Sequence, residues 1–147
     1  MTTLASEFQR VWALDRLGRS LCPPEKVFTV QAADQYEDEQ TGKMKNVDPP
    51  YMVIVFEDAV QTGGTNLTIS METPVTISAF AGRRDVAEKI RTRARDLFNE
   101  YPDFKLVGAE MVQDVRIEGH GENEPVNGVF ELFQRFMVDT SVERRAR

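Results

Sequence analysis

The chain has one histidine and one cysteine, the two residue types most often used for acid–base and nucleophilic chemistry. His120 lies in the sequence EGHGE, and glycines on both sides leave nothing rigid to hold a catalytic ring in place. Cys22 follows an apolar stretch and precedes two prolines, which favours a small buried residue over a nucleophile. A single cysteine cannot build a cysteine-based metal site. We therefore expect no catalytic residues, no cofactor, no metal site and no enzymatic activity.

The sequence Gly82-Arg83-Arg84-Asp85 is the other place where ligand chemistry is conceivable. It joins a stretch with the period of a strand to one with the period of a helix, and free amides at a helix N-terminus attract phosphate. The turn lacks the further glycines, lysine and Ser/Thr of a phosphate-binding loop. Asp85 also places a negative charge at the helix start, where the helix dipole would otherwise favour an anionic ligand. A simple helix start is the favoured interpretation, with an anion site as the alternative.

Two helices are expected, one directly after this turn and one in the N-terminal region. The spacing predicts a helix over residues 83–101, with its apolar residues at Val86, Ile90, Ala94, Leu97, Phe98 and Tyr101. Its arginines and lysine surround the helix and alternate with acids, which favours a solvated face used partly for a protein contact over DNA reading. A first helix is expected from Leu4 to Leu21, ended by Pro23-Pro24. Its apolar stripe comprises Leu4, Phe8, Val11, Leu14, Leu17 and Leu21.

The rest of the chain has the two-residue period of strands. Strands are expected at 27–30, 51–59, 67–73, 75–81, 106–117 and 129–140, with Gln113 and Gln134 interrupting the last two. The strand at 51–59 is apolar on both faces, which is typical of a covered central strand. Residues 61–66 and 118–128 are rich in turn formers and are expected to connect strands. The fold class is therefore α+β: a mainly antiparallel sheet of about four to six strands, flanked by two helices, with a long loop or hairpin after the first strand.

The core is expected to combine one face from each element. These faces are Leu4/Phe8/Val11/Leu14, Met52/Ile54/Phe56, Val75/Ile77, Val86/Ile90/Leu97 and Phe130/Leu132/Phe136. A length of 147 residues suits a single domain, 1–147. The net charge of −6 disfavours a general surface for nucleic acid or for an anionic membrane. No apolar run long enough for a membrane span and no secretory signal is present, so a reducing cytoplasm fits best.

Two polar segments are candidates for contact with other proteins. Residues 33–50 form an extended polar loop in which acids precede lysines, and loops of this length are commonly either functional or disordered. The tail at 141–147 is basic in a chain that is otherwise acidic. The candidate residues for a subunit or partner interface are Tyr36, Glu37, Asp38, Glu39, Lys43, Lys45, Arg144, Arg145 and Arg147.

The order of elements resembles the tail terminator proteins of long-tailed bacteriophages. The resemblance rests on an N-terminal helix, then PPYMVIVFEDA, then a strand that runs into a helix as VTISAFAGRRDVAEKIRTRARDLF, then two closing strands that end in FELFQRFMVD. It implies a structural protein of the virion neck or tail, present in the host cytoplasm before assembly. It also implies a homohexameric ring that caps the tail tube, stops its polymerisation and docks to the head connector or stopper protein. DNA would pass through the lumen without specific binding, and no membrane would be involved.

Two alternatives remain open. The first is a head-completion or stopper protein, or another neck protein of the same fold family, which differs from a terminator only in the ring that it contacts. The second belongs to a different class: a small cytoplasmic ligand-binding or regulatory α+β domain that binds a partner through its basic tail. A ligand-binding domain would need a pocket with converging polar groups, and the sequence offers no candidate beyond the Gly82 turn.

Overall fold

The computed structural model describes residues 4–30, 48–65, 68–99 and 110–143 of the 147-residue chain. The fold is α+β, as expected, with three helices, one short 3-10 helix and six strands in the described residues. In chain order these are α1 (Leu4–Leu14), α2 (Arg16–Leu21), η1 (Pro24–Lys26), β1 (Val27–Val30), β2 (Tyr51–Phe56), β3 (Val60–Gly64), β4 (Thr68–Ala81), α3 (Arg84–Asn99), β5 (Glu110–Val126) and β6 (Val129–Glu143).

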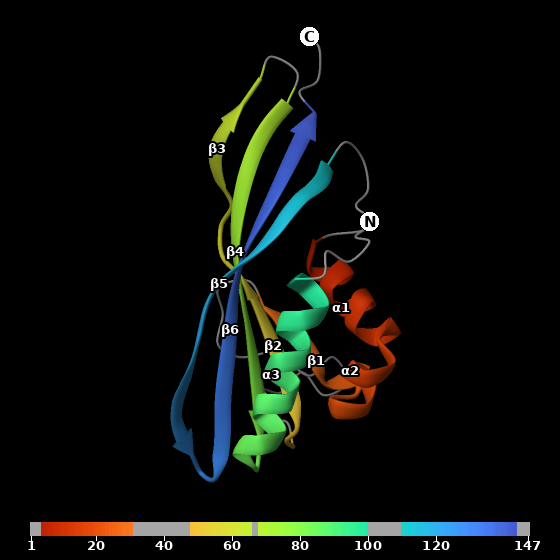
Figure 1. The fold of residues 1–147 in the computed structure, drawn as a ribbon, viewed down its shortest axis with the longest axis vertical. Helices are drawn as coiled ribbons and strands as arrows, with labels where there is room; N and C mark the ends of the chain where they lie inside the picture. Colours follow the sequence, from red (N-terminus) through yellow and green to blue (C-terminus); the bar gives the residue numbers. More distant parts are fainter. Residues whose placement is uncertain (1–3, 31–47, 66–67, 100–109, 144–147) are drawn as a thin grey trace, which may run out of the picture.

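All six strands belong to one sheet with the order β1-β2-β4-β6-β5, and β3 pairs with β4 beside this path. The β1–β2 pair is parallel and the other pairs are antiparallel. The molecule is elongated along its strands, and the three helices cover one face of only one half of the sheet (Figure 1). The other half extends beyond the described helices (Figure 1). We call it the projection: β3 with residues 68–73 of β4, 110–114 of β5 and 139–143 of β6.

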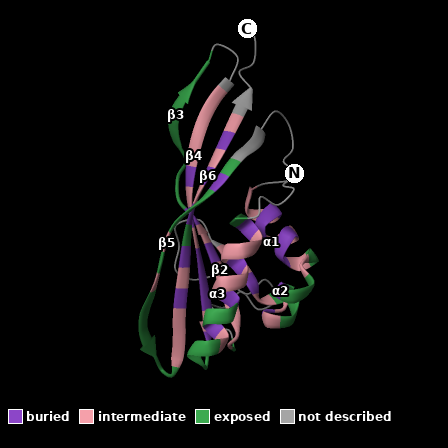
Figure 2. Cartoon of the chain, in the orientation of Figure 1, coloured by how far each residue is buried: buried purple, intermediate pink, exposed green. Residues whose placement is uncertain are grey.

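The core lies between the covered half of the sheet and helices α1 and α3 (Figure 2). Alternate residues of the strands point to the helices, because successive side chains of a strand lie on opposite faces. Three ring contacts centre on Phe8 and Phe98: Phe8 lies 4.5 Å from Phe98 and 5.5 Å from Phe56, and Phe98 lies 6.1 Å from Phe136. The expected core residues of β2, β4 and β6 are buried, apart from Phe130, which is partly buried.

The predicted first helix is interrupted at Asp15. Leu14 was wrongly assigned to the core, and Leu17 of the same apolar stripe is exposed as well. Leu14 is 69% exposed and Leu17 is 54% exposed. Asp15 has extended backbone angles and caps α2, because its carboxylate accepts a 2.7 Å hydrogen bond from the amide of Gly18. The new direction of α2 turns this part of the stripe away from the core. Trp12 fills the core instead, fully buried, and its Nε1 donates to the carbonyl of Cys22 at 3.0 Å.

Two predicted strands on either side of Pro74 form one continuous strand, β4, of 14 residues. A proline inside a strand removes one ladder donor. The carbonyl of Pro74 accepts a hydrogen bond from the amide of Glu57. This bond lies on the edge of β4 that faces β2 and β3, in the gap between the end of β2 and the start of β3. The missing donor also lies on this side, so the pairing with β6 continues through Pro74↔Met137. The prediction of a turn at 61–66 was wrong in most of its length, because residues 61–64 belong to strand β3.

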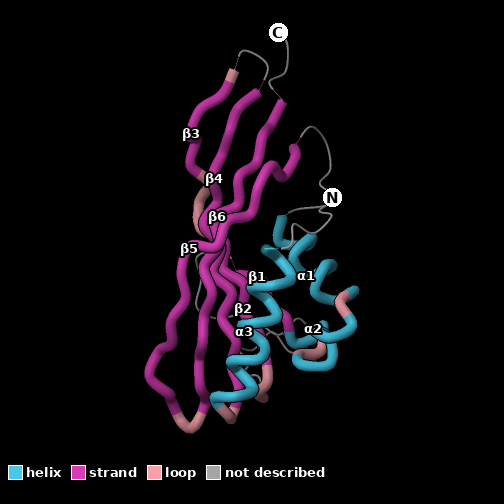
Figure 3. Tube along the Cα trace, in the orientation of Figure 1, coloured by secondary structure: helices cyan, strands magenta, loops and turns pink. Residues whose placement is uncertain are grey.

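The predicted connection at 118–128 is also mostly strand. β5 runs to Val126, and the chain reverses only at Asn127 and Gly128, whose φ angles are +52° and +77° (Figure 3). Two residues with positive φ are the requirement of a tight hairpin turn, which Asn-Gly meets well. Gln134 does not interrupt its strand: it is buried with Leu132 and Phe136 on the helix-facing side. Its Nε2 donates to the carbonyl of Gly119, beside a β-bulge of β5, at 2.7 Å.

Candidate assembly surfaces

The predicted interface residues all lie outside the described part of the chain. They are Tyr36, Glu37, Asp38, Glu39, Lys43, Lys45, Arg144, Arg145 and Arg147. The structure does place the points from which their segments depart. β1 ends at Val30 and pairs in parallel with β2, whereas the described part of β6 ends at Glu143, opposite Thr68 in the projection. The two candidate segments therefore leave the described fold at different places.

The two residues considered for catalysis do not form a site. Cys22 is fully buried, and this burial raises the pKa of its thiol to about 12, which keeps it protonated at neutral pH. His120 is exposed and lies in β5, an edge strand, rather than in a turn. Within the described residues, no group of three or more His, Cys, Asp or Glu side chains is placed to hold a metal ion. In the same part of the chain, no helix is long and apolar enough to cross a membrane.

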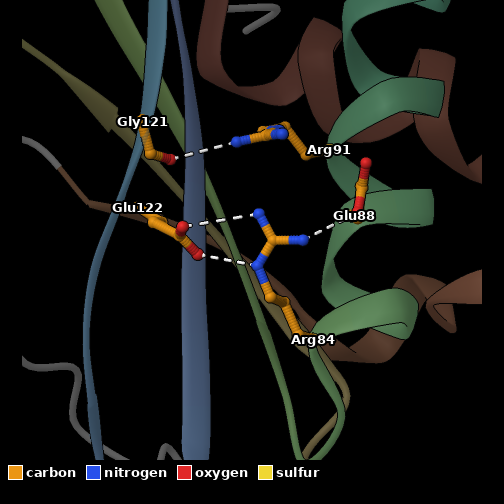
Figure 4. Close-up of polar contacts among 5 residues, drawn as sticks. All are labelled: Arg84, Glu88, Arg91, Gly121 and Glu122. Atoms are coloured by element: carbon orange, nitrogen blue, oxygen red, sulfur yellow. Dashed lines mark hydrogen bonds and ion pairs between the residues drawn. The ribbon is translucent and has the colours of Figure 1, made fainter.

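The arginines near Gly82 are engaged inside the chain. Arg84 contacts Glu122 of β5 at 2.9 Å and Glu88 of its own helix at 3.0 Å (Figure 4). Arg91 donates to the carbonyl of Gly121 at 3.2 Å (Figure 4). The hydrogen bonds from Arg84 hold the pKa of Glu122 below its usual value. These contacts fasten α3 to β5. Because Arg84 already pairs with carboxylates of the same chain, the Gly82 turn is better explained as a helix start than as an anion site.

The sheet has a second apolar face, and no described helix covers it. We call it the open face: Phe28, Tyr51, Val53, Phe80, Phe133 and Met137, all half-buried. The strand register places them together, since Tyr51 pairs with Phe80, and Ser78 pairs with both Val53 and Phe133. β2 is an interior strand between β1 and β4, away from the sheet edge as predicted, but the described helices cover it on one face only (Figure 1). The sequence signal for the open face was the apolar character of β2 in both alternating positions.

The rings of the open face are ordered by contacts with one another. Tyr51 stacks on Phe80 with a centroid distance of 4.5 Å and an interplanar angle of 7°. Phe28 meets Tyr51 edge-on at 6.5 Å. The ring of Phe133 lies over Gly121, where an added Cβ would stand 2.7 Å from the ring, and Arg135 lies 5.5 Å from the same ring. Large ordered aromatic side chains at a surface are a common feature of protein interfaces.

The same side of the sheet becomes acidic in the projection. Glu72, Asp139 and Asp114 lie across three neighbouring strands, in the register Glu72↔Asp139↔Asp114. We call them the acidic ladder. Arg116 contacts Asp139 at 3.3 Å and Glu72 at 2.9 Å, and these carboxylates raise the pKa of its guanidinium. Among the described side chains of the ladder and its neighbour Arg116, three carboxylates face one arginine, so their sum is negative.

Comparison with known proteins identifies the fold. No protein-family model matches the chain, and no curated protein sequence matches it. Among solved structures, the chain is similar to one from a structure described as "Virion of native gene transfer agent (GTA) particle", with a TM-score of 0.71 and 10% sequence identity. The similarity covers 96% of this chain and 95% of the other. At this identity the likeness establishes a shared fold across almost the entire length of both chains.

Proposed function

We propose that this chain is a structural protein of a phage-like virion and has no catalytic role. One observation carries the proposal: the fold of nearly the whole chain is shared with a chain of a gene transfer agent virion. The shared fold covers 96% of this chain and 95% of the other, so little of either chain lies outside it. The ordered rings of the open face support it, since large aromatic side chains at a surface are common in protein interfaces.

Within the virion, we propose the role of tail terminator. Six copies would form a ring at the head-proximal end of the tail tube, stop tube polymerisation and dock to the head connector. The layout of the sequence, from the strand at Tyr51 to the aromatic closing strand β6, supports this role through its resemblance to that family. The acidic ladder and the net charge of −6 fit a lumen through which DNA passes without being bound.

The test is assembly with purified proteins. The wild-type chain, alone or mixed with the tail tube protein, should elute at several times its mass of 16.7 kDa and appear as rings in negative-stain electron microscopy. Added to polymerising tail tube protein, it should cap tube ends and shorten the tubes. Tyr51→Ser/Phe80→Ser should lose capping while remaining folded. A matched control, Thr62→Ala/Thr65→Ala on the exposed part of the projection near β3, should cap normally.

The same experiment separates the alternatives. A stopper or other neck protein would bind the head connector and leave tube growth unchanged. A small ligand-binding or regulatory domain would stay monomeric and ignore both partners, and that result would refute the structural role.

A further inference from the structure

Exposed apolar side chains occur at two places on opposite flanks of the molecule, and two further ones, Val60 and Ile117, lie elsewhere on strands β3 and β5. The large hydrophobic residues exposed in the described chain are Leu14, Leu17, Val60, Ile117 and Val126. Leu14 and Leu17 flank the junction of α1 and α2, and with the exposed Arg16 and Arg19 they form what we call the helical corner. Val126 is 69% exposed at the end of β5, and with the exposed Glu124 and Pro125 it forms what we call the hairpin tip.

The two surfaces have opposite charge. Residues 117–131, which include the hairpin tip, contain four glutamates and no lysine or arginine. Only Glu122 of these four forms an ion pair with a described residue, through Arg84. At the helical corner, Asp15 is neutralised by Arg93, while Arg16 and Arg19 form no ion pair with any residue that the structure describes. The corner is therefore apolar and basic, and the tip is apolar and acidic.

The sheet order separates the two surfaces. β5 forms one edge of the sheet, and β1 forms the other edge. α1 is tied to β1 by a 3.0 Å hydrogen bond from Gln9 to the carbonyl of Val27. The helical corner and the β5–β6 hairpin consequently lie on opposite flanks, with β4 and α3 between them (Figure 1). One copy cannot bring its own corner and tip together, whereas two copies can do so side by side.

The edge of β5 is unsuited to docking by strand addition. Its pairing with β6 has bulges at Val112/Asp114, Ile117/Gly119 and Asn123/Val126, and Pro125 removes one backbone donor. Bulges, prolines and charges are the features that prevent an edge strand from pairing with another strand. A partner at the tip must therefore be held through side chains, which is what an apolar centre ringed by charges provides.

We propose that the helical corner of one copy binds the hairpin tip of the next copy. This inference rests on the proposed function and names the surfaces that meet in its ring. Leu14 and Leu17 would pack on Val126 and Pro125, while Arg16 and Arg19 face the glutamates of the hairpin. Such a contact joins two different surfaces, so it repeats head to tail and closes into a ring when the rotation between copies allows it.

Charge reversal tests the electrostatic part of this contact. Arg16→Glu/Arg19→Glu and Glu124→Lys/Glu131→Lys, the second pair lying at the tip or next to it, should each lower the ring fraction, measured by mass photometry at low salt, by at least about tenfold. An equimolar mixture of the two variants should regain mixed oligomers, because one copy's reversed corner then meets the other's reversed tip. Glu57→Lys/Asp58→Lys, which makes the same charge change at another exposed position, is the matched control and should assemble normally.

Cysteine cross-linking tests the contact itself. Mixed Leu17→Cys and Val126→Cys proteins should form a disulfide-linked pair, and the double variant should form a covalent ladder whose longest member gives the ring number. Leu17→Cys with Val60→Cys, at an equally exposed residue of the projection, should form neither. Rings without the Leu17–Val126 cross-link and insensitive to charge reversal would overturn this inference alone. A wild-type chain that forms no oligomer, with or without tail tube protein, would overturn both the inference and the proposed function.

Discussion

Asp15 serves two elements with one carboxylate. It accepts the amide of Gly18 as the cap of α2, and it receives two hydrogen bonds from Arg93 of α3, at 2.7 and 2.8 Å. Its side chain is only 13% exposed, so solvent screens the pair weakly. The hydrogen bond from Arg93 is the largest cause that lowers the pKa of Asp15 below its ordinary value of 3.8. This residue therefore couples the N-terminal helices to α3.

We predict that Asp15→Asn lowers the free energy of unfolding by about 1–3 kcal/mol at pH 7, since it removes the charge-assisted pair with Arg93, while asparagine can still cap α2. Because the folded-state pKa lies below 3.8, the stabilisation is fully present above that pH and is lost as the pH falls through the lower, folded-state pKa. Urea unfolding at pH 7 and near pH 2.5 should show the variant's deficit shrinking in acid. A deficit that is equal at both pH values would contradict this role.

Gly18 is a second residue whose role is set by close contact. A Cβ at this position would lie 2.9 Å from Asp15 Oδ2 and 3.1 Å from the Trp12 ring. Both neighbours are held in place, Asp15 by Arg93 and Trp12 by its bond to the Cys22 carbonyl. We predict that Gly18→Ala destabilises by about 1–3 kcal/mol, although alanine is the better helix former by about 1 kcal/mol. Thermal unfolding measures this, with Gly82→Ala as control because open space surrounds that glycine. A stabilised Gly18→Ala variant would refute the close fit.

The buried thiol and the exposed imidazole lead to a third prediction. Cys22 lies in the core, and His120 is exposed on the edge strand β5. The double variant Cys22→Ser/His120→Ala should retain ring formation and tube capping. Capping assays on the folded double variant, with circular dichroism as the check of folding, provide the measurement. A large loss of capping in a protein that remains folded would show that one of these residues has a function.

At the scale of elements, α3 is the helix whose packing is easiest to test. Ala87, Ile90, Ala94 and Phe98 are buried against the sheet, on the face expected from the apolar spacing. Ile90→Ala should lower the free energy of unfolding by about 2–4 kcal/mol, because it leaves a cavity in a closely packed core. Lys89→Ala on the exposed side should change it little. Chemical denaturation of both variants measures these free energies of unfolding. A change below about 0.5 kcal/mol for Ile90→Ala would contradict the assigned buried face of α3.

The sequence predicted elements well where hydrophobic period and burial coincide. Met52, Ile54 and Phe56 alternate along β2 as the core requires, and Ile90 lies on the buried face of α3. The sequence-based prediction was wrong where a single local contact sets the direction of the chain. An apolar stripe runs through Asp15, and only the cap and the Arg93 pair reveal that Leu14 and Leu17 face solvent. Glycines at 119 and 121 suggested a loop, whereas Gly121 makes room in a strand for the Phe133 ring.

The candidate surfaces were harder to predict for a different reason. Alternation assigns side chains to two faces of a strand, but it does not say whether a second apolar face is covered by the same chain or by another one. Tyr51 and Val53 therefore suggested a strand covered on both sides, and the structure leaves their face without a described helix. The hairpin tip was hidden because residues 118–128 read as one long connection, while the turn uses only Asn127 and Gly128.

At the scale of the whole molecule, the segment at 33–50 remains a prediction, because residues 31–47 lie outside the described part. We expect this segment to contact an adjacent subunit or the next ring, with its acids and lysines facing opposite charges there. Replacing residues 35–46 with a short Gly-Ser linker should leave the fold intact and abolish ring formation or docking on tail tubes. Size-exclusion chromatography and tube capping measure the two effects. A shortened protein that assembles and caps tubes with normal affinity would show that the segment is dispensable.

The unbroken pairing of β4 with β6 has a mechanical consequence. Their register runs from Thr68↔Glu143 in the projection to Ala81↔Phe130 beside the helices, and β5 follows the same path along β6. Three covalent backbones thus cross from one half of the molecule to the other, and no hinge of loose chain separates the halves. A push or pull on the projection is carried along stiff polypeptide rather than by hydrogen bonds that can unzip. The two halves of the subunit are therefore expected to move together.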